Sequence, residues 1–465
     1  VNGDVESEKK AITKTDFFDD YCLVFVCVAI GDKKAEKSLT VCKCNDFDKT
    51  VELKLAGCLY DCLAEIFDYK PCWGILTGIR PARLYLKKLN ELGLPAANSY
   101  FTDVLKVSPD KLSLLSDTAI SEQRIIGLSK SNSFSLYISI PFCPTRCSYC
   151  SFVSHSIEKA SDIIPEYIDR LFAEITATAK ITSDLNLNLE TVYIGGGTPT
   201  SLSAEQLEKL LTVIDNNFDM KNIREYTVEA GRPDTVTPSK LSVLKAHNVT
   251  RISINPQTLN DNVLNIIGRR HTADDFFNAF FMARKIGFEN INTDIIAGLP
   301  GDDYHSFKET IDKIIKLSPE AVTVHSLSMK RSSKLTLNGF EPLIKEGETA
   351  SKMVNYAREL LSNHGILPYY MYRQSKTVGN LENVGYAKKD FEGLYNVYIM
   401  DETHSILACG ASAVTKLKNQ ATGHIARIFN FKYPYEYINR FDEQLRRKQE
   451  IYSFYGTCNE NKVML

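Results

Sequence analysis

The sequence has no long apolar run and almost no excess of charge. No run of about eighteen apolar residues occurs, so no membrane-spanning helix is predicted. The formal net charge of −2 gives no reason to expect a nucleic acid or an anionic membrane as partner. Residues 1–20 carry no signal-peptide pattern, and repeats and low-complexity tracts are absent. We therefore expect a cytoplasmic globular protein.

A disulfide framework of the kind found in small secreted domains is not predicted either, although the chain has twelve cysteines. A chain of 465 residues is long enough for two or three domains with cores of their own. Seven of the cysteines precede residue 73, namely Cys22, Cys27, Cys42, Cys44, Cys58, Cys62 and Cys72. We interpret these seven as buried apolar side chains. A second metal site at Cys42/Cys44 or Cys58/Cys62 is the alternative. So many thiols favour a reducing compartment.

The chain is organised around a cysteine loop that follows a short apolar segment. Its spacing, Cys143-x-x-x-Cys147-x-x-Cys150, brings three thiolates close together, and soft sulfur ligands hold iron. Three cysteines on a four-iron cluster leave one iron open for a substrate or a cofactor. A closed zinc site with His155 as the fourth ligand is the alternative.

A glycine run and three polar residues lie where strands are predicted to end. Gly195, Gly196 and Gly197 let the backbone approach a ligand closely, because glycine has no Cβ. A phosphate loop is not predicted, since no Gly-Lys-Ser/Thr follows. The polar residues of this kind are Glu229, Gln257 and Asp294.

Strand and helix patterns alternate over residues 131–335, which predicts an α/β fold with a parallel sheet, because parallel neighbours need crossover helices. The six predicted strands span residues 134–140, 190–194, 225–228, 251–255, 290–296 and 321–325. Six units rather than eight predict a partial (β/α)6 barrel of the TIM type, with its site at the carboxyl ends of the strands. Residues 1–130 are predicted to form an N-terminal α+β domain. Residues 336–465 are predicted to form a C-terminal α+β domain, in which residues 395–400 and 405–409 pair as strands.

The cysteine loop resembles the signature of the radical S-adenosylmethionine (SAM) enzymes. Residues 137–150, with residues 195–200, resemble the oxygen-independent coproporphyrinogen III oxidase (coproporphyrinogen dehydrogenase) family. Four further segments resemble the HemZ-type branch of that family: residues 73–81, 369–376, 382–387 and 393–400. The resemblance implies a radical SAM barrel with a 4Fe–4S cluster and SAM as cofactors. It also implies oxidative decarboxylation of coproporphyrinogen III to protoporphyrinogen IX in haem biosynthesis, with the C-terminal domain covering the substrate.

The resemblance also implies a role for each residue of the site. The implied catalytic residues are the cluster ligands Cys143, Cys147 and Cys150 and the preceding Tyr137, which also contacts the cofactor. The implied site for the SAM amino group is formed by Gly195, Gly196, Gly197 and Thr198. The other implied SAM contacts are Glu229 for the methionine group, Gln257 and Asp294 for the ribose, Arg269 for the carboxylate and Ile296 for the adenine. Arginine suits a carboxylate because its fork is bidentate. The adjacent Arg270 is the alternative.

Basic residues near the last barrel strand are candidates for binding the propionates of such a substrate. Arg331 and Arg373 are the predicted substrate contacts, with Lys330 nearby. His271 and His325 are candidate acid–base groups. The implied partners are a tetrapyrrole substrate and an electron-donor protein such as flavodoxin or ferredoxin.

Two other functions are open to the same residues. One is a haem-binding or trafficking protein of the same family, and the other is a radical SAM methyltransferase or a haem-degrading enzyme. Phe152 stands where the oxidases often have a further cysteine. The chaperone pattern His-Asn-x-x-Tyr-Trp is absent, and the comparable stretch is Asn383-Val-Gly-Tyr-Ala387. The oxidase activity is therefore predicted first.

Overall fold

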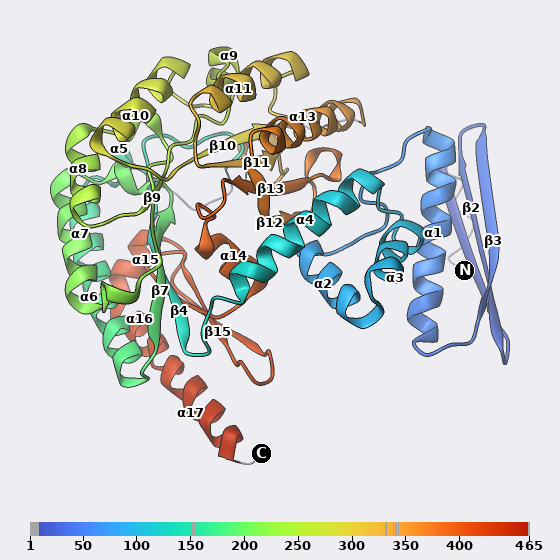
Figure 1. Cartoon of the computed structure of the whole chain (residues 1–465), viewed down its shortest axis with the longest axis horizontal. Coiled ribbons are helices and arrows are strands. Elements are labelled where there is room, and N and C mark those ends of the chain that lie inside the picture. The colour runs from blue at the N-terminus through green and yellow to red at the C-terminus, as the bar shows by residue number, and fades with distance from the viewer. Residues whose placement is uncertain are drawn as a thin grey trace. The chain divides into compact units, whose positions relative to one another are not determined.

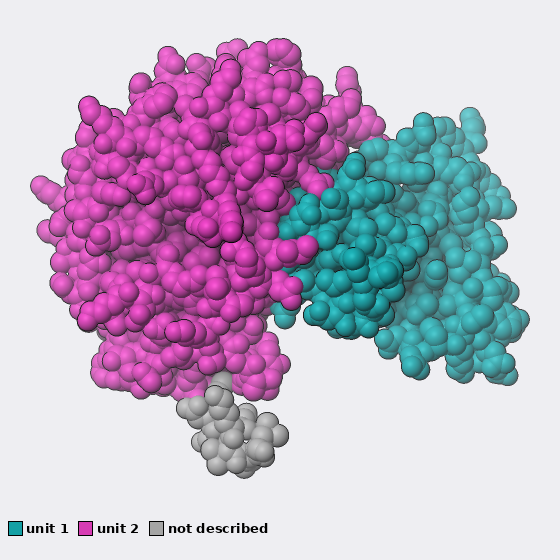
Figure 2. Space-filling model, in the orientation of Figure 1, with its two compact units in different colours: residues 1–119 teal, residues 120–465 magenta. Residues whose placement is uncertain are grey.

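The computed structural model describes residues 9–150, 155–330, 333–337, 339, 342 and 344–463, with side chains described as far as residue 456. The chain divides into two compact units, residues 1–119 and residues 120–465 (Figure 2). The division into three domains stays a prediction. Phe152 and Arg331 lie outside the described residues. No helix of the described part is both long and apolar enough to cross a membrane.

Unit 1 contains a three-stranded antiparallel sheet with one helix packed on it. The strands are β1 (Lys9–Phe17), β2 (Tyr21–Ile30) and β3 (Lys33–Cys42), and the helix is α1 (Phe47–Phe67). Alternate residues of β2 are buried, and Cys58 and Cys62 of α1 pack in the same core. The apolar interpretation is confirmed for Cys22, Cys58 and Cys62, which are buried, and it is wrong for Cys42 and Cys44, which are exposed. The helices that follow are α2 (Pro81–Leu92), α3 (Leu94–Ser99) and α4 (Pro109–Ile126), the last of which continues into unit 2.

Unit 2 is built on one eleven-stranded sheet with the order β12-β13-β11-β10-β9-β8-β7-β4-β14-β15-β16. Six neighbouring parallel strands confirm the predicted (β/α)6 barrel: β4 (Ser133–Ile140), β7 (Asn188–Gly196), β8 (Glu225–Glu229), β9 (Arg251–Ser253), β10 (Ile291–Ala297) and β11 (Ala321–Ser326). The helices on the outer face of the sheet (Figure 1) are α6 (Ile164–Asp184), α7 (Ala204–Asn217), α8 (Pro238–Ala246), α10 (Ala273–Ile286) and α11 (Tyr304–Lys316). The start of α7 is marked in the sequence, because Ser203 and Gln206 form a capping box there.

The last part of the chain lengthens both edges of this parallel sheet. On one edge, β13 (Glu382–Ala387) pairs antiparallel with β11, and β12 (Leu367–Arg373) pairs with β13. On the other edge, β14 (Ser405–Cys409) runs parallel to β4. β15 (Val414–Lys418) and β16 (Ile425–Phe429) then continue the sheet as antiparallel strands.

One predicted hairpin is wrong. Residues 395–400 do not form a strand but lie in helix α14 (Leu394–Asp401). The buried carboxylate of Glu225 accepts hydrogen bonds from the backbone N–H groups of Leu394 and Tyr395. These groups have no partner inside the helix, and a carboxylate at that end also offsets the helix dipole. A contact 169 positions away in the sequence therefore outweighs the strand-like pattern.

A buried ion pair joins the end of the chain to the first large barrel helix. Lys448 of α16 (Phe441–Lys448) lies 3.2 Å from Glu174 of α6, and both side chains are fully buried. Glu174 also accepts hydrogen bonds from the N–H of Gly410 and from Asn430.

The other strands and α-helices of unit 2 are β5 (Phe142–Cys143), β6 (His155–Ser156), α5 (Ile157–Ala160), α9 (Asp261–Ile266), α12 (Lys334–Leu337), α13 (Ile344–Asn363), α15 (Pro434–Asn439) and α17 (Glu450–Val463).

Candidate active site

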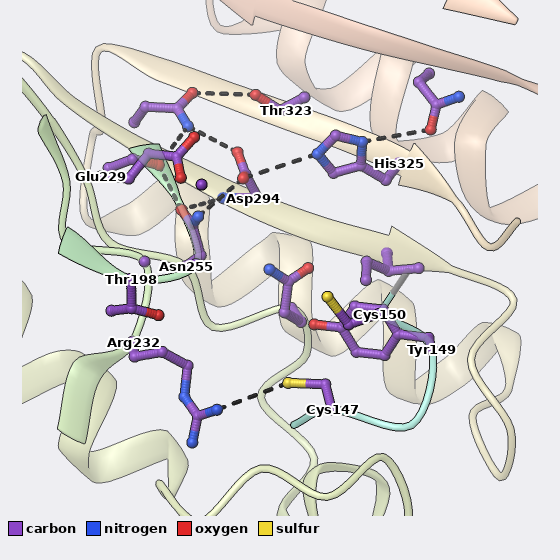
Figure 3. Close-up of a pocket in the computed structure, with 18 of the residues that line it drawn as sticks. Cys147, Tyr149, Cys150, Thr198, Glu229, Arg232, Asn255, Asp294, Thr323 and His325 are labelled. Carbon is purple, nitrogen blue, oxygen red and sulfur yellow. Dashed lines mark hydrogen bonds and ion pairs between the residues drawn. The ribbon is translucent and has the colours of Figure 1, made fainter. Parts of the chain in front are cut away.

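A cavity of about 380 Å³ lies at the carboxyl ends of the barrel strands (Figure 3). This is a usual volume for a small-molecule site. Eleven of the predicted residues line it: Cys143, Cys147, Cys150, Gly196, Gly197, Thr198, Glu229, Gln257, Asp294, Arg269 and Ile296. Of the predicted residues that the structure describes, Tyr137, Gly195 and Arg373 do not line the cavity.

The glycine run packs directly against the cysteine loop. A Cβ at Gly197 would lie 2.5 Å from the carbonyl oxygen of Phe142 and 3.0 Å from Sγ of Cys143. The next residue, Thr198, donates its backbone N–H to Phe142 at 2.8 Å and its hydroxyl to Sγ of Cys143 at 3.5 Å. Glycine at 197 is therefore required for close packing on the first cysteine.

The three cysteines of the loop suit an iron–sulfur cluster in which each cysteine binds a different iron. Each lies on the wall of the same cavity, and none of the three is in a disulfide. In the described part of the chain, no three His, Cys, Asp or Glu side chains converge on a position for a single metal ion. A four-iron cluster does not require this, because each cysteine binds a different iron. The donor set therefore suits iron–sulfur chemistry.

Two buried polar atoms in the cavity have no hydrogen-bond partner among the described residues. They are Oε1 of Gln257 and Nε of Arg269. The other nitrogens of Arg269 donate to backbone oxygens, at 2.6 Å for Asn255, and to the hydroxyl of Tyr149. Buried polar groups without a partner call for an explanation, and a bound ligand is one. An amide oxygen and a guanidinium nitrogen have the chemistry to contact the polar groups of SAM. Arg270, the alternative, is exposed and pairs with Glu158.

Gln257 also has a strained backbone. Its φ of 69° is left-handed, which is uncommon outside glycine. Backbone hydrogen bonds to Asp294 and Ile296 on β10, at 3.0 and 2.9 Å, hold it in this conformation. Strain that the surrounding structure maintains at a cavity wall is typical of a ligand-binding position.

A polar network crosses the barrel interior beside the cavity. Asp294 accepts hydrogen bonds from Asn255 at 2.9 Å and from Asn292 at 2.7 Å, and it faces His325 at 3.7 Å (Figure 3). Burial raises the pKa of Asp294, but the contacts with His325 and Asn292 outweigh it and hold that pKa below its usual range. The carboxylate stays charged and is fixed in place.

Glu229, at the end of β8, is held by Tyr193 of β7. The tyrosine donates to the carboxylate at 2.5 Å, and a Cβ at Gly195 would lie 3.0 Å from it. Burial raises the pKa of Glu229 to about 7, although the hydrogen bond from Tyr193 opposes this. Tyr193 stacks on Tyr395 of α14 at 4.4 Å between centroids, and Tyr137 stacks on the same ring at 6.1 Å. Tyr137 thus packs in a tyrosine stack rather than in the cavity wall.

The wall contributed by β12 and its neighbours was only partly predicted. Tyr370, Tyr372 and Gln374 line the cavity, whereas Arg373 is buried on the opposite side and donates to the backbone oxygen of Asn380. The alternation of side chains along a strand would have separated Arg373 from these three. Other lining residues missed from the sequence are Tyr149, Arg232, Arg251 and Asn255. Of the two candidate histidines, His325 lines the cavity and His271 is buried outside its wall.

Comparison with known proteins identifies the family. The Radical SAM superfamily profile matches residues 137–314. The oxygen-independent coproporphyrinogen-III oxidase-like protein HemZ of Bacillus subtilis is 38% identical over 390 residues, which are 82% of this chain and 77% of that protein. The chain belongs to the HemZ-like family of radical SAM proteins. Members of the radical SAM superfamily use a 4Fe–4S cluster and SAM, so these are the cofactors of this HemZ-like chain.

The HemZ-like chain also has more distant relatives. The heme chaperone HemW of Bacillus subtilis is 34% identical over 286 residues, covering 60% of this chain and 70% of that protein. The structure of the coproporphyrinogen III oxidase HemN of Escherichia coli matches with a TM-score of 0.55 at 22% identity, over 70% of this chain and 73% of that one. At that identity the match supports the radical SAM fold of the HemZ-like chain and no more.

Proposed function

We propose that the chain is a SAM-dependent coproporphyrinogen dehydrogenase, which converts two propionates of coproporphyrinogen III into vinyl groups and so makes protoporphyrinogen IX. The observation that carries this proposal is the composition of one cavity. The cysteine loop is part of its wall, and Tyr370, Tyr372 and Lys330 are another part. Aromatic rings suit a large apolar macrocycle, and a lysine suits a carboxylate. The name of the HemZ relative supports the same substrate class.

The residues of the chain would bind and orient the reacting groups. Cys143, Cys147 and Cys150 would hold the cluster, and the unpartnered atoms of Gln257 and Arg269 would hold SAM. When bound, the cluster and SAM supply radical chemistry that removes a hydrogen atom from an unactivated carbon. An electron-donor protein such as flavodoxin or ferredoxin is the proposed reductant for SAM cleavage. An electron acceptor would take the one electron that each propionate releases when it loses CO2 and becomes a vinyl group.

Lys330 is the proposed contact for a propionate. It is the described basic residue nearest in sequence to the predicted Arg331, and it lines the cavity. Burial lowers the pKa of its ammonium group, and a carboxylate beside it would favour the charged form. Arg373 is buried away from the cavity, so we do not propose it as a direct contact.

The test is an anaerobic assay of the cluster-loaded protein with SAM, a reductant and coproporphyrinogen III, read by mass spectrometry. We expect a product that has lost two carboxyl groups and no product from Cys147→Ala. Lys330→Gln should raise the KM for the porphyrinogen about tenfold or more, since a charged hydrogen bond is worth about 1.5–3 kcal/mol. SAM cleavage with unchanged porphyrinogen would contradict the proposal that coproporphyrinogen III is the substrate.

A haem carrier is the second candidate, because the HemW relative named a heme chaperone is 34% identical to this chain. The same preparation distinguishes the two functions. Stoichiometric haem binding with no SAM cleavage, in a protein whose cluster is complete and reducible, would favour the carrier. Haem consumption or a methylated product would instead indicate one of the other radical SAM reactions.

A further inference from the structure

Arg232 contacts the cysteine loop and has no role among those expected from the sequence. It follows β8 by three residues, and its side chain is 3% exposed. One N–H of its guanidinium points at Sγ of Cys147 across 3.6 Å (Figure 3). Cys147 itself is only 8% exposed, so bulk water has little access to replace this contact.

The other contacts of Arg232 fix its orientation. Nε and Nη2 each lie 3.1 Å from a different carboxylate oxygen of Asp234, which is a bidentate pair. Nη1 and Nη2 each donate to the hydroxyl of Thr145 at 3.1 Å. Thr145 lies between the first two cysteines of the loop. The guanidinium therefore ties the middle of the loop, and Cys147 beside it, to the end of β8.

A fixed positive donor beside a cluster ligand has a defined electrostatic effect. Arginine stays charged at any ordinary pH and has no acceptor atom, so its N–H groups always face the sulfur as donors. Hydrogen bonds to the sulfurs, net charge and solvent exposure are the quantities that set the reduction potential of an iron–sulfur cluster. A donor that withdraws electron density from the Cys147 thiolate stabilises the reduced, more negative cluster.

We propose that Arg232 is a positioning residue for the cluster, which shapes the loop between Cys143 and Cys147 and raises the cluster's reduction potential through its N–H···S contact with Cys147. This proposal rests on the cofactor of the family and is independent of which substrate is used. Arg232 and Arg269 both line the cavity and both interact with Cys147, but Nε of Arg269 has no partner among the described residues and is left for SAM. Arg232 has its donors occupied by the loop and by Asp234.

The test measures the cluster itself, without SAM or substrate. Arg232→Gln is neutral, and Arg270→Gln serves as the matched control, because Arg270 is exposed and pairs with Glu158. After anaerobic reconstitution we would measure iron and sulfide per chain, and then the midpoint potential in a redox titration followed by electron paramagnetic resonance. For Arg232→Gln we expect an equilibrium constant for one-electron reduction about tenfold lower, which corresponds to about 59 mV, and no change for the control.

The possible outcomes separate cleanly. A fully loaded Arg232→Gln protein with the wild-type potential would overturn the proposal. The positioning role would be supported if the Arg232→Gln protein is folded before reconstitution and then takes up little iron. If Arg232→Gln does not fold, Arg232→Lys decides, because a single ammonium cannot face Asp234, Thr145 and Cys147 together. Lowered iron content or potential in Arg232→Lys supports the proposal, and wild-type values for both overturn it. Failure of the porphyrinogen assay alone would leave these readouts unaffected.

Discussion

Tyr193 donates a hydrogen bond of 2.5 Å to Glu229 across two neighbouring barrel strands. This bond holds a buried carboxyl group whose pKa burial raises from 4.5 to about 7. Between these two pH values the folded chain binds more protons than the unfolded chain, so stability falls as the pH rises. The free-energy cost of ionising the buried Glu229 carboxyl group is absent below about pH 4.5 and complete above about pH 7.

Glu229→Gln should remove this pH dependence. Relative to wild type, the SAM-free variant should gain up to about 3 kcal/mol in free energy of unfolding at pH 8 and little at pH 5. Urea unfolding at the two pH values measures the difference. Glu359→Gln, on an exposed position of α13, is the control and should show the same change at both. An equal effect of Glu229→Gln at both pH values would contradict the raised pKa.

Gly197→Ala should damage the cysteine loop. The added Cβ would lie 2.5 Å from the carbonyl oxygen of Phe142, and overpacking of this kind costs about 1–3 kcal/mol. We expect a lower iron content per chain after anaerobic reconstitution. Gly456→Ala is the matched control, since a Cβ there meets nothing within 4 Å. Full iron loading in Gly197→Ala would show that the loop tolerates the shift.

Arg269→Ala should weaken SAM binding while Arg270→Ala should not. Loss of a charged hydrogen bond costs about 1.5–3 kcal/mol, or roughly 10- to 100-fold in Kd. Equilibrium dialysis of SAM with cluster-loaded, unreduced protein measures binding without cleavage. The neighbouring Arg270 is exposed and pairs with Glu158, so its loss controls for charge. A larger increase in the Kd for SAM in Arg270→Ala than in Arg269→Ala would assign the carboxylate contact to Arg270 instead.

Lys448→Met should destabilise unit 2 strongly. It leaves the fully buried carboxylate of Glu174 without its counter-charge, and breaking a buried pair by removing one partner costs about 3–5 kcal/mol. Urea denaturation of the full chain reports the loss. Lys180→Met removes the cation of an exposed pair with Asp184 and should change stability by about 0.5 kcal/mol or less. A loss of about 1 kcal/mol or less for Lys448→Met would contradict the expected cost of an unpaired buried charge.

The sequence predicted those features that depend on local patterns. The spacing of Cys143, Cys147 and Cys150 implied the cluster, and the alternation of strands and helices predicted the barrel that places Glu229 and Asp294 at one end. Strand ends in a parallel barrel face the same way, so residues distant in sequence could be grouped before their geometry was known.

The features that it did not predict depend on contacts between distant segments. Residues 395–400 have strand-like composition, but the carboxylate of Glu225 on another element fixes them as a helix. No motif in the sequence marks Arg232, and only the fold brings its guanidinium to Cys147. The charge of Arg373 predicts a substrate contact, whereas its position on β12 directs it away from the cavity that its neighbours line.

The parallel pairing of β14 with β4 has a consequence for how the chain is made. His404, directly before β14, contacts Ser129, which lies 275 positions earlier, just ahead of β4. A ribosome therefore releases the barrel strands long before the segments that complete both edges of the sheet. Open strand edges are prone to pair with other chains, and contacts of such long sequence separation form slowly. Newly made chains should consequently need protection by a chaperone until β16 has been synthesised, and truncation near residue 400 should yield aggregates rather than a smaller barrel.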